Sequence, residues 1–146
     1  MKPLKDSSGY TLLEMLVTLG LVVIIGAMAM PVASDYRNQF AMQSATERLG
    51  AEIGRARMQA VSQNVLVRIR FAGLSYVRER SADGVTFVAD DVPVTLPPGV
   101  SASFEGVGGP VFDGTGLAPE STVITLQNGA VTKTIYTNVL GRVNIS

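Results

Sequence analysis

The chain has 146 residues, enough for one ordinary domain with an appendage but not for two full domains. It carries 12 basic and 12 acidic side chains, and this zero net charge argues against a general polyanion-binding protein. There is no cysteine and no histidine, which excludes disulfides, Ser-His-Asp triads, Cys-His dyads and the usual zinc sites. We therefore expect a protein that is not an enzyme and that needs no cofactor or metal.

The N-terminus combines a short polar segment with a long apolar one. Residues 1–9, MKPLKDSSG, hold Lys2 and Lys5 against one acid, and basic residues before an apolar run favour a cytoplasmic N-terminus. From Met15 to Ala33 there is no charged residue. A helix over residues 10–33 would extend about 36 Å, which exceeds a bilayer core of about 30 Å. We predict a transmembrane helix there.

Three interpretations of this segment compete, and Glu14 separates them. One is a signal peptide cut after Ala29, since Ala27-Met28-Ala29 fits the small-x-small cleavage pattern. The others are a permanent anchor and a leader cut ahead of the apolar block. A carboxylate inside an apolar helix costs a few kcal/mol and calls for a positive partner. Cleavage before Tyr10 would create an α-amine four residues ahead of Glu14, in the same chain or a neighbouring one.

The run Gly9-Tyr10-Thr11-Leu12-Leu13-Glu14 before the apolar helix resembles the processing site of type IV pilins and type II secretion pseudopilins. The resemblance implies that a prepilin peptidase cuts between Gly9 and Tyr10 and methylates the Tyr10 amine. It also implies that Glu14 recruits the subunit into a filament. Pro31 falls where these proteins commonly carry a helix proline, which would bend the helix.

The following segment predicts an amphipathic helix over residues 34–63, continuous with the first. An apolar stripe recurs at helical spacing: Ala45, Leu49, Ile53, Ala56 and Ala60. Glu52 and Arg55 have the spacing of a helix ion pair. The stripe requires another element to pack on.

Residues 64–146 predict a β-rich head. Strands are expected at 65–71, 76–80, 85–88, 92–96, 100–104, 123–126, 131–136 and 138–145. Turns are expected at 72–75, 82–84 and Asn128-Gly129, and a flexible connection at 106–110. The fold class is therefore α+β, a long N-terminal helix packed on an antiparallel sheet. The domains are a leader over 1–9, a filament-core helix over 10–33, an amphipathic helix over 34–63 and the head over 64–146.

Two parts of the head could suggest binding chemistry. Six arginines lie within 26 residues, namely Arg55, Arg57, Arg68, Arg70, Arg78 and Arg80. A DNA surface would interleave aromatic residues, so we favour solvent faces partly matched by Glu52 and Glu79, and consider nucleic acid an unlikely partner. Asp113-Gly114-Thr115-Gly116 lacks the carboxylates of a calcium loop, so we predict a tight turn there, and a solvated loop at Asp90-Asp91.

The motifs 45–49 (ATERL), 56–61 (ARMQAV) and Gly141-Arg142-Val143 are similar to the helix and C-terminal signature of the GspH/FimT minor pseudopilin group. The resemblance implies an H-type minor pseudopilin of a type II secretion system, anchored in the bacterial inner membrane with a periplasmic head. Its partners would be major and minor pseudopilins, the prepilin peptidase and the inner-membrane assembly platform. The alternatives are a FimT/FimU-like minor pilin of a type IV pilus, and a soluble secreted binding domain released at Ala29.

Overall fold

The computed structural model describes residues 10–105 and 108–146, and for residues 28–33 it describes the backbone only. The predicted leader, including Gly9, and part of the predicted connection 106–110 therefore lie outside the described residues. The chain divides into two units, Met1–Tyr36 and Arg37–Ser146. The second unit, the head, holds the hydrophobic core and all of the strands found in the described chain.

The helix α1 runs from Leu12 to Gln63, as the two predicted helical segments together require, and its backbone stays helical through Pro31. It ends in a Schellman motif: the Val65 N–H donates to the Ala60 carbonyl at 3.2 Å, and Asn64 has a φ of 53°. Asparagine tolerates this left-handed conformation better than most residues, so the sequence itself stops the helix there. The predicted bend at Pro31 remains a prediction.

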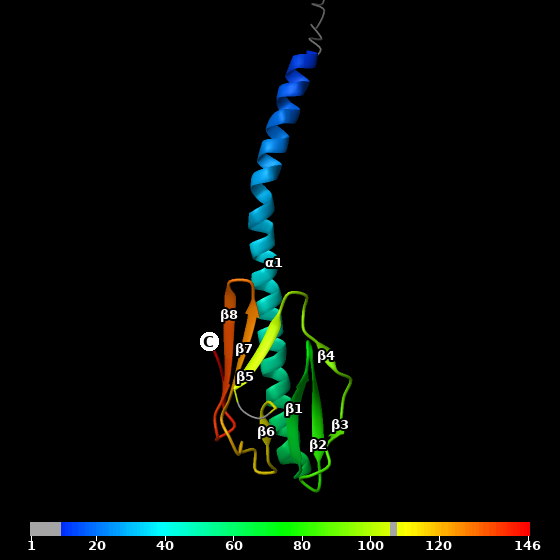
Figure 1. The fold of residues 1–146 in the computed structure, drawn as a ribbon, viewed down its shortest axis with the longest axis vertical. Helices are drawn as coiled ribbons and strands as arrows, with labels where there is room; N and C mark the ends of the chain where they lie inside the picture. The colour runs from blue at the N-terminus through cyan, green and yellow to red at the C-terminus, as the bar shows by residue number, and fades with distance from the viewer. Residues whose placement is uncertain (1–9, 106–107) are drawn as a thin grey trace, which may run out of the picture. The chain divides into compact units, whose positions relative to one another are not determined.

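The head contains two antiparallel sheets, whereas the sequence predicts one. The first sheet has the order β3-β2-β1-β6, with β4 also paired to β2. Its strands are β1 Leu66–Ala72, β2 Ser75–Ser81, β3 Val88–Ala89, β4 Val94–Thr95 and β6 Val111–Phe112. The second has the order β5-β7-β8-β9, with strands β5 Ser101–Glu105, β7 Thr122–Asn128, β8 Val131–Thr137 and β9 Val143–Ile145. Figure 1 shows them beside the head portion of α1.

One core joins α1 to both sheets. The predicted stripe from Ala45 to Ala60 is at most 3% exposed, and Met42 extends it by one turn. Against it pack Val67, Ile69 and Phe112 of the first sheet and Ile124, Leu126 and Ile135 of the second, all fully buried. The alternating burial of β1 and β7 follows from the period-two pattern, so packing of this stripe positions everything else in the head.

Several predicted strand limits are wrong. The expected strand 85–88 is mostly a turn, because one Asp83 carboxylate oxygen accepts hydrogen bonds from the N–H groups of Val85 and Thr86. Asn128 pairs with Val131, so the hairpin loop is Gly129-Ala130 rather than Asn128-Gly129. Residues 138–142 form a turn instead of the start of the last strand, with Gly141 N–H donating to the Asn138 carbonyl at 2.8 Å.

Candidate functional site

The N-terminal end of α1 is capped by its own sequence. Thr11 precedes the helix, and its hydroxyl accepts the backbone N–H of Glu14 at 3.2 Å, while its carbonyl accepts the N–H of Met15. Thr11-Leu12-Leu13-Glu14 has the spacing of a capping box, and an acid in the first turn also favours the helix dipole. The cap thus uses the backbone of Glu14 and leaves its carboxylate without a hydrogen bond among the described residues.

The structure describes some of the predicted site residues more fully than others. Gly9 lies outside the described residues, and Pro31 is described by its backbone alone. Tyr10 is 75% exposed, and Glu14 is exposed without an ion pair to any described residue. Cleavage, methylation and charge pairing at these positions remain predictions.

The first turns of α1 expose apolar side chains on every side. The large ones that are between 54% and 79% exposed are Leu12, Leu13, Met15, Leu16, Val17, Leu19, Leu21, Val22, Val23, Ile24 and Ile25. Apolar surface removed from water stabilises by about 25 cal/mol per Å², and an exposed patch of this kind marks a surface used for interaction. The segment is therefore an unpaired apolar surface that other molecules must cover. Within the described part of the chain, no helix qualifies as a membrane span by length and apolarity.

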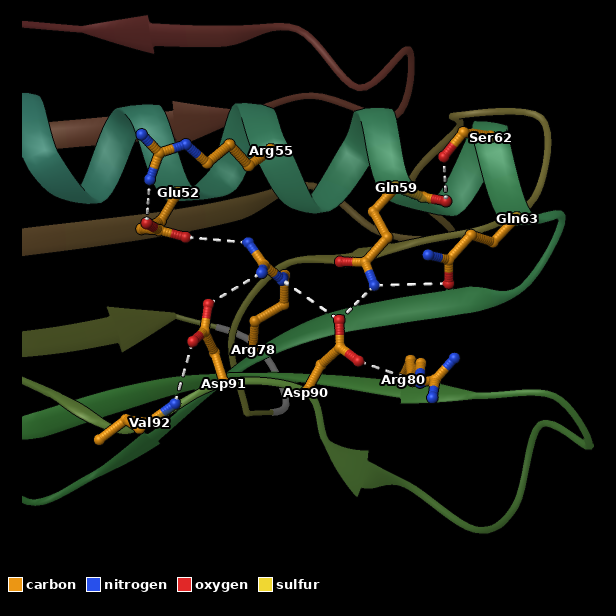
Figure 2. A network of polar contacts seen from close by, with 10 residues as sticks. All are labelled: Glu52, Arg55, Gln59, Ser62, Gln63, Arg78, Arg80, Asp90, Asp91 and Val92. Atoms are coloured by element: carbon orange, nitrogen blue, oxygen red, sulfur yellow. Dashed lines mark hydrogen bonds and ion pairs between the residues drawn. The ribbon is translucent and has the colours of Figure 1, made fainter.

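The arginines of the head are held by carboxylates. Figure 2 shows Glu52 of α1 between Arg55, at 2.5 Å, and Arg78 of β2, at 3.1 Å. The predicted helix pair is confirmed, and it is one part of a larger network. Asp90 and Asp91 lie in an exposed loop, as predicted, and they also belong to this network.

These two aspartates follow β3 and face β2. Asp91 pairs with Arg78 at 3.0 Å, and Asp90 pairs with Arg80 at 3.1 Å and accepts a hydrogen bond from Gln59 of α1. The network joins α1, β2 and the chain after β3, elements that the sequence separates by about 30 residues. The carboxylates of the head therefore pair with Arg78 and Arg80. This agrees with the sequence-based expectation that acidic side chains match part of the arginine cluster, rather than with a DNA-binding surface.

On β1 and β2 a second ion-pair group surrounds Glu79. This carboxylate is 5% exposed and accepts from Arg68 at 2.7 Å and from Arg70 at 2.6 Å. The Arg68 guanidinium also lies 3.7 Å from the centre of the Phe87 ring. Burial by itself raises the pKa of Glu79, but hydrogen bonds from Arg70 and Arg68 outweigh it, so the pKa is lowered.

This lowered pKa predicts a pH-dependent stability. A carboxylate with a depressed folded pKa stabilises above its unfolded pKa of about 4.3, and this contribution disappears as the pH falls through the folded value. We expect Glu79→Gln to lower the free energy of unfolding by about 1–2 kcal/mol at pH 7, because both arginines are partly exposed. The variant should also lose less stability between pH 5 and pH 3 in urea unfolding.

The control for this experiment is Glu120→Gln, which removes an exposed acid without an ion pair in the described chain. It should follow the wild-type pH profile. An unchanged profile for Glu79→Gln would contradict the role of this carboxylate.

The Asp113 loop is a turn, as predicted. A single Asp113 oxygen accepts from the Thr115 hydroxyl at 2.6 Å and from the N–H groups of Thr115 and Leu117. The hydrogen bond from the Thr115 side chain contributes most to lowering the pKa of Asp113. Within the described residues, no group of acidic side chains could hold a metal ion.

Arg57 of α1 connects this loop to the C-terminal turn through hydrogen bonds. Its Nε donates to the Gly116 carbonyl at 2.9 Å, and its Nη2 donates to the Leu140 carbonyl at 3.2 Å. A Cβ on Gly141 would lie 2.6 Å from Arg57 Nε and 2.3 Å from the Gly116 carbonyl oxygen. The arginine therefore requires glycine at 141, which joins the helix and C-terminal motifs in one packing unit. The sequence carries both motifs but no signal that they touch.

The chain is similar to known proteins both in its N-terminal sequence and in its fold. Residues 4–30 match the prokaryotic N-terminal methylation motif. The structure is similar to the type IV minor pilin FimU of Pseudomonas aeruginosa, with a TM-score of 0.64 and 18% identity over 76% of this chain and 92% of the FimU chain. The chain therefore has the fold of type IV pilin-like proteins. The predicted fold class, a long N-terminal helix on an antiparallel β head, is thereby confirmed.

Two further proteins are similar to this chain over part of its length. The minor pseudopilin EpsH from the Type 2 Secretion System of Vibrio cholerae has a TM-score of 0.61 and 8% identity, over 72% of this chain and 95% of EpsH. The pilin-like protein PilA1 of Thermus thermophilus is 31% identical over 91 residues, or 62% of this chain. The match spans 54% of the length of PilA1, just over half.

Proposed function

We propose that the chain is a minor structural subunit of a type IV pilin-like filament. The observation that supports this most directly is the apolar surface of α1 between Leu12 and Ile25, which is exposed on all sides and lies within the match to the methylation motif. Parallel packing of such helices from many subunits would cover this surface. The role is structural and involves no cofactor, metal or catalytic step.

Processing would precede assembly. A prepilin peptidase would cut between Gly9 and Tyr10, and a glycine at the cut allows close approach of an enzyme to the backbone. The freed and methylated Tyr10 amine would meet Glu14 of an adjacent subunit inside the apolar filament core. An unpaired Glu14 carboxylate on the described helix end is consistent with this pairing.

Before assembly, the precursor would be anchored in the inner membrane. Residues 10–33 would cross the bilayer with the N-terminus in the cytoplasm, and the amphipathic segment 34–63 would lead into the β-rich part of the chain, 64–146, in the periplasm. The charge-free run from Met15 to Ala33 and the basic Lys2 and Lys5 support this orientation. The assembly platform in the inner membrane would be the next partner.

For the machine, we propose the H-type position in a type II secretion pseudopilus, among major and minor pseudopilins. The C-terminal motif at 141–143 and the likeness to EpsH support it. A minor pilin of a type IV pilus is the second candidate, and the higher TM-score with FimU favours it. A DNA-binding version of this second role is disfavoured, because carboxylates engage five of the six clustered arginines.

A chromosomal deletion in the native host distinguishes the two candidates. The pseudopilin assignment predicts that exported proteins accumulate in the periplasm of the deletion strain, while surface pili and twitching motility remain normal. Complementation with the wild-type gene should restore export. Normal export with lost pili would instead identify a minor pilin, and normal behaviour in both assays would contradict the filament role.

A further inference from the structure

Arg48 of the head differs from the six arginines between 55 and 80. The guanidinium of Arg48, on α1, has neither an ion pair nor a hydrogen bond within the part of the chain that the structure describes, and its side chain is exposed. By contrast, the six arginines between 55 and 80 each contact a carboxylate or a backbone carbonyl: Arg55, Arg57, Arg68, Arg70, Arg78 and Arg80. Arg48 is thus a cation available to another molecule.

Arg48 borders a cavity of about 330 Å³ in the head. The walls come from α1, β2 and the chain after β4, and they include Ser44, Ala45, Arg48, Tyr76, Leu96 and Pro97. Ligand pockets of this kind measure about 300–1,000 Å³, so this one is at the small end. Its size suits one amino-acid side chain together with its backbone.

Tyr76, in the wall of the same cavity, has a hydroxyl group that makes no hydrogen bond to any described residue. Its side chain is 3% exposed, and its hydroxyl is buried without a hydrogen-bond partner among the described residues. Burial raises the pKa of Tyr76, and the positive charge of Arg48 acts in the opposite direction, which places the two groups within electrostatic reach. Glu52 also acts on Tyr76, but two arginines, Arg55 and Arg78, already pair with that carboxylate.

A second hollow on α1 shares part of its lining with this cavity. Phe40, Gln43, Ser44, Glu47 and Arg48 line an adjoining hollow, so Ser44 and Arg48 belong to both. Phe40 is 75% exposed, which is unusual for a phenylalanine in a folded domain. These two adjacent hollows suit a short segment whose side chain enters the cavity.

We propose that this cavity is a docking site for an aspartate or glutamate side chain of a neighbouring filament subunit. Arg48 would bind the carboxylate through two N–H groups, and the Tyr76 hydroxyl would donate a third hydrogen bond. Leu96 and Pro97 would shield the pair from water. The identity of the partner rests on the proposed function, whereas the preference for a carboxylate rests on the cavity alone.

The test uses two blocked tripeptides, Ac-Ala-Glu-Ala-NH2 and Ac-Ala-Gln-Ala-NH2, titrated into the isotope-labelled full chain in detergent micelles. The expected result is saturable NMR shifts at the Arg48 Nε–H and the Leu96 amide with the glutamate peptide. The glutamine peptide should bind at least about tenfold more weakly, since a charge-assisted hydrogen bond is lost. Arg48→Gln should abolish the shift of the Leu96 amide, and Tyr76→Phe should weaken binding several-fold.

The control Arg142→Gln removes the same charge from an exposed position elsewhere in the head and should bind like wild type. Equal binding of both peptides, absence of a saturable shift, or binding unaffected by Arg48→Gln would overturn the site. These measurements do not depend on export, pili or the mature N-terminus, so the site and the filament role can fail separately.

A photoreactive amino acid at Thr95 in the native host then tests the partner. The cross-link should map beside an aspartate or glutamate of another pilin-like subunit and disappear with Arg48→Gln. A cross-link that persists in that variant, or that maps to a protein outside the filament, would overturn the assignment of the partner.

Discussion

Replacing Gly141 with alanine is expected to destabilise the head by roughly 3 kcal/mol or more. Two effects combine. The φ of Gly141 is +71°, a left-handed conformation that costs an L-residue about 1–2 kcal/mol. The added Cβ would also lie 2.3 Å from the Gly116 carbonyl oxygen and 2.6 Å from Arg57 Nε. Relief of this overlap, at about 1–3 kcal/mol, requires moving Arg57 or the Asp113 loop and losing their hydrogen bonds.

Gly129→Ala is the matched control. Gly129 has a φ of +59°, but its added Cβ would meet nothing within 4 Å, so only the backbone term of about 1 kcal/mol applies. Urea unfolding of the full-length protein at pH 7, followed by circular dichroism, measures both. Equal losses of stability in the two variants would mean that the packing of Arg57 does not require glycine at position 141.

The second large effect is expected at Glu14, in assembly and not in folding. Glu14→Gln should reduce the amount of subunit recovered in sheared or purified filaments by at least about tenfold in a deletion strain. Truncating one member of a desolvated charge pair typically costs 2–5 kcal/mol, because the other charge remains buried and unpaired. The helix start should persist, because Thr11 accepts the backbone N–H of residue 14, which glutamine retains.

Glu120→Gln supplies the comparison, since it neutralises an exposed acid in the head, away from α1 and from the Arg48 cavity. It should assemble at the wild-type level. Normal incorporation of Glu14→Gln, with membrane levels equal to wild type, would contradict a role of the Glu14 carboxylate in filament assembly.

The sequence predicted those elements that carry a long periodic pattern. The stripe from Ala45 to Ala60 identified the buried face of α1, and the alternation in β1 and β7 identified two hairpins. The two-residue strands β3, β4 and β6 are too short to show a period. Their positions follow from pairing across the sheet, so the division into two sheets could not be seen in the sequence.

The contacts within the head were less predictable than the motifs. Gly9, Tyr10 and Glu14 stand in one contiguous pattern, so they could be identified without a structure. Asp90 and Arg80 are ten residues apart, and Arg48 and Tyr76 are 28 residues apart, with no spacing rule that joins them. Such long-range pairs depend on tertiary packing, which places the chain after β3 and β4 against α1 and β2.

The most direct test of the filament role is the mature N-terminus of the protein from its native host, by intact mass and terminal sequencing. A chain that begins with N-methylated Tyr10 is the predicted result and would establish processing between Gly9 and Tyr10. A chain that begins at Met30 would contradict the proposal, because cleavage after Ala29 removes Glu14 and the apolar surface on which the filament role depends.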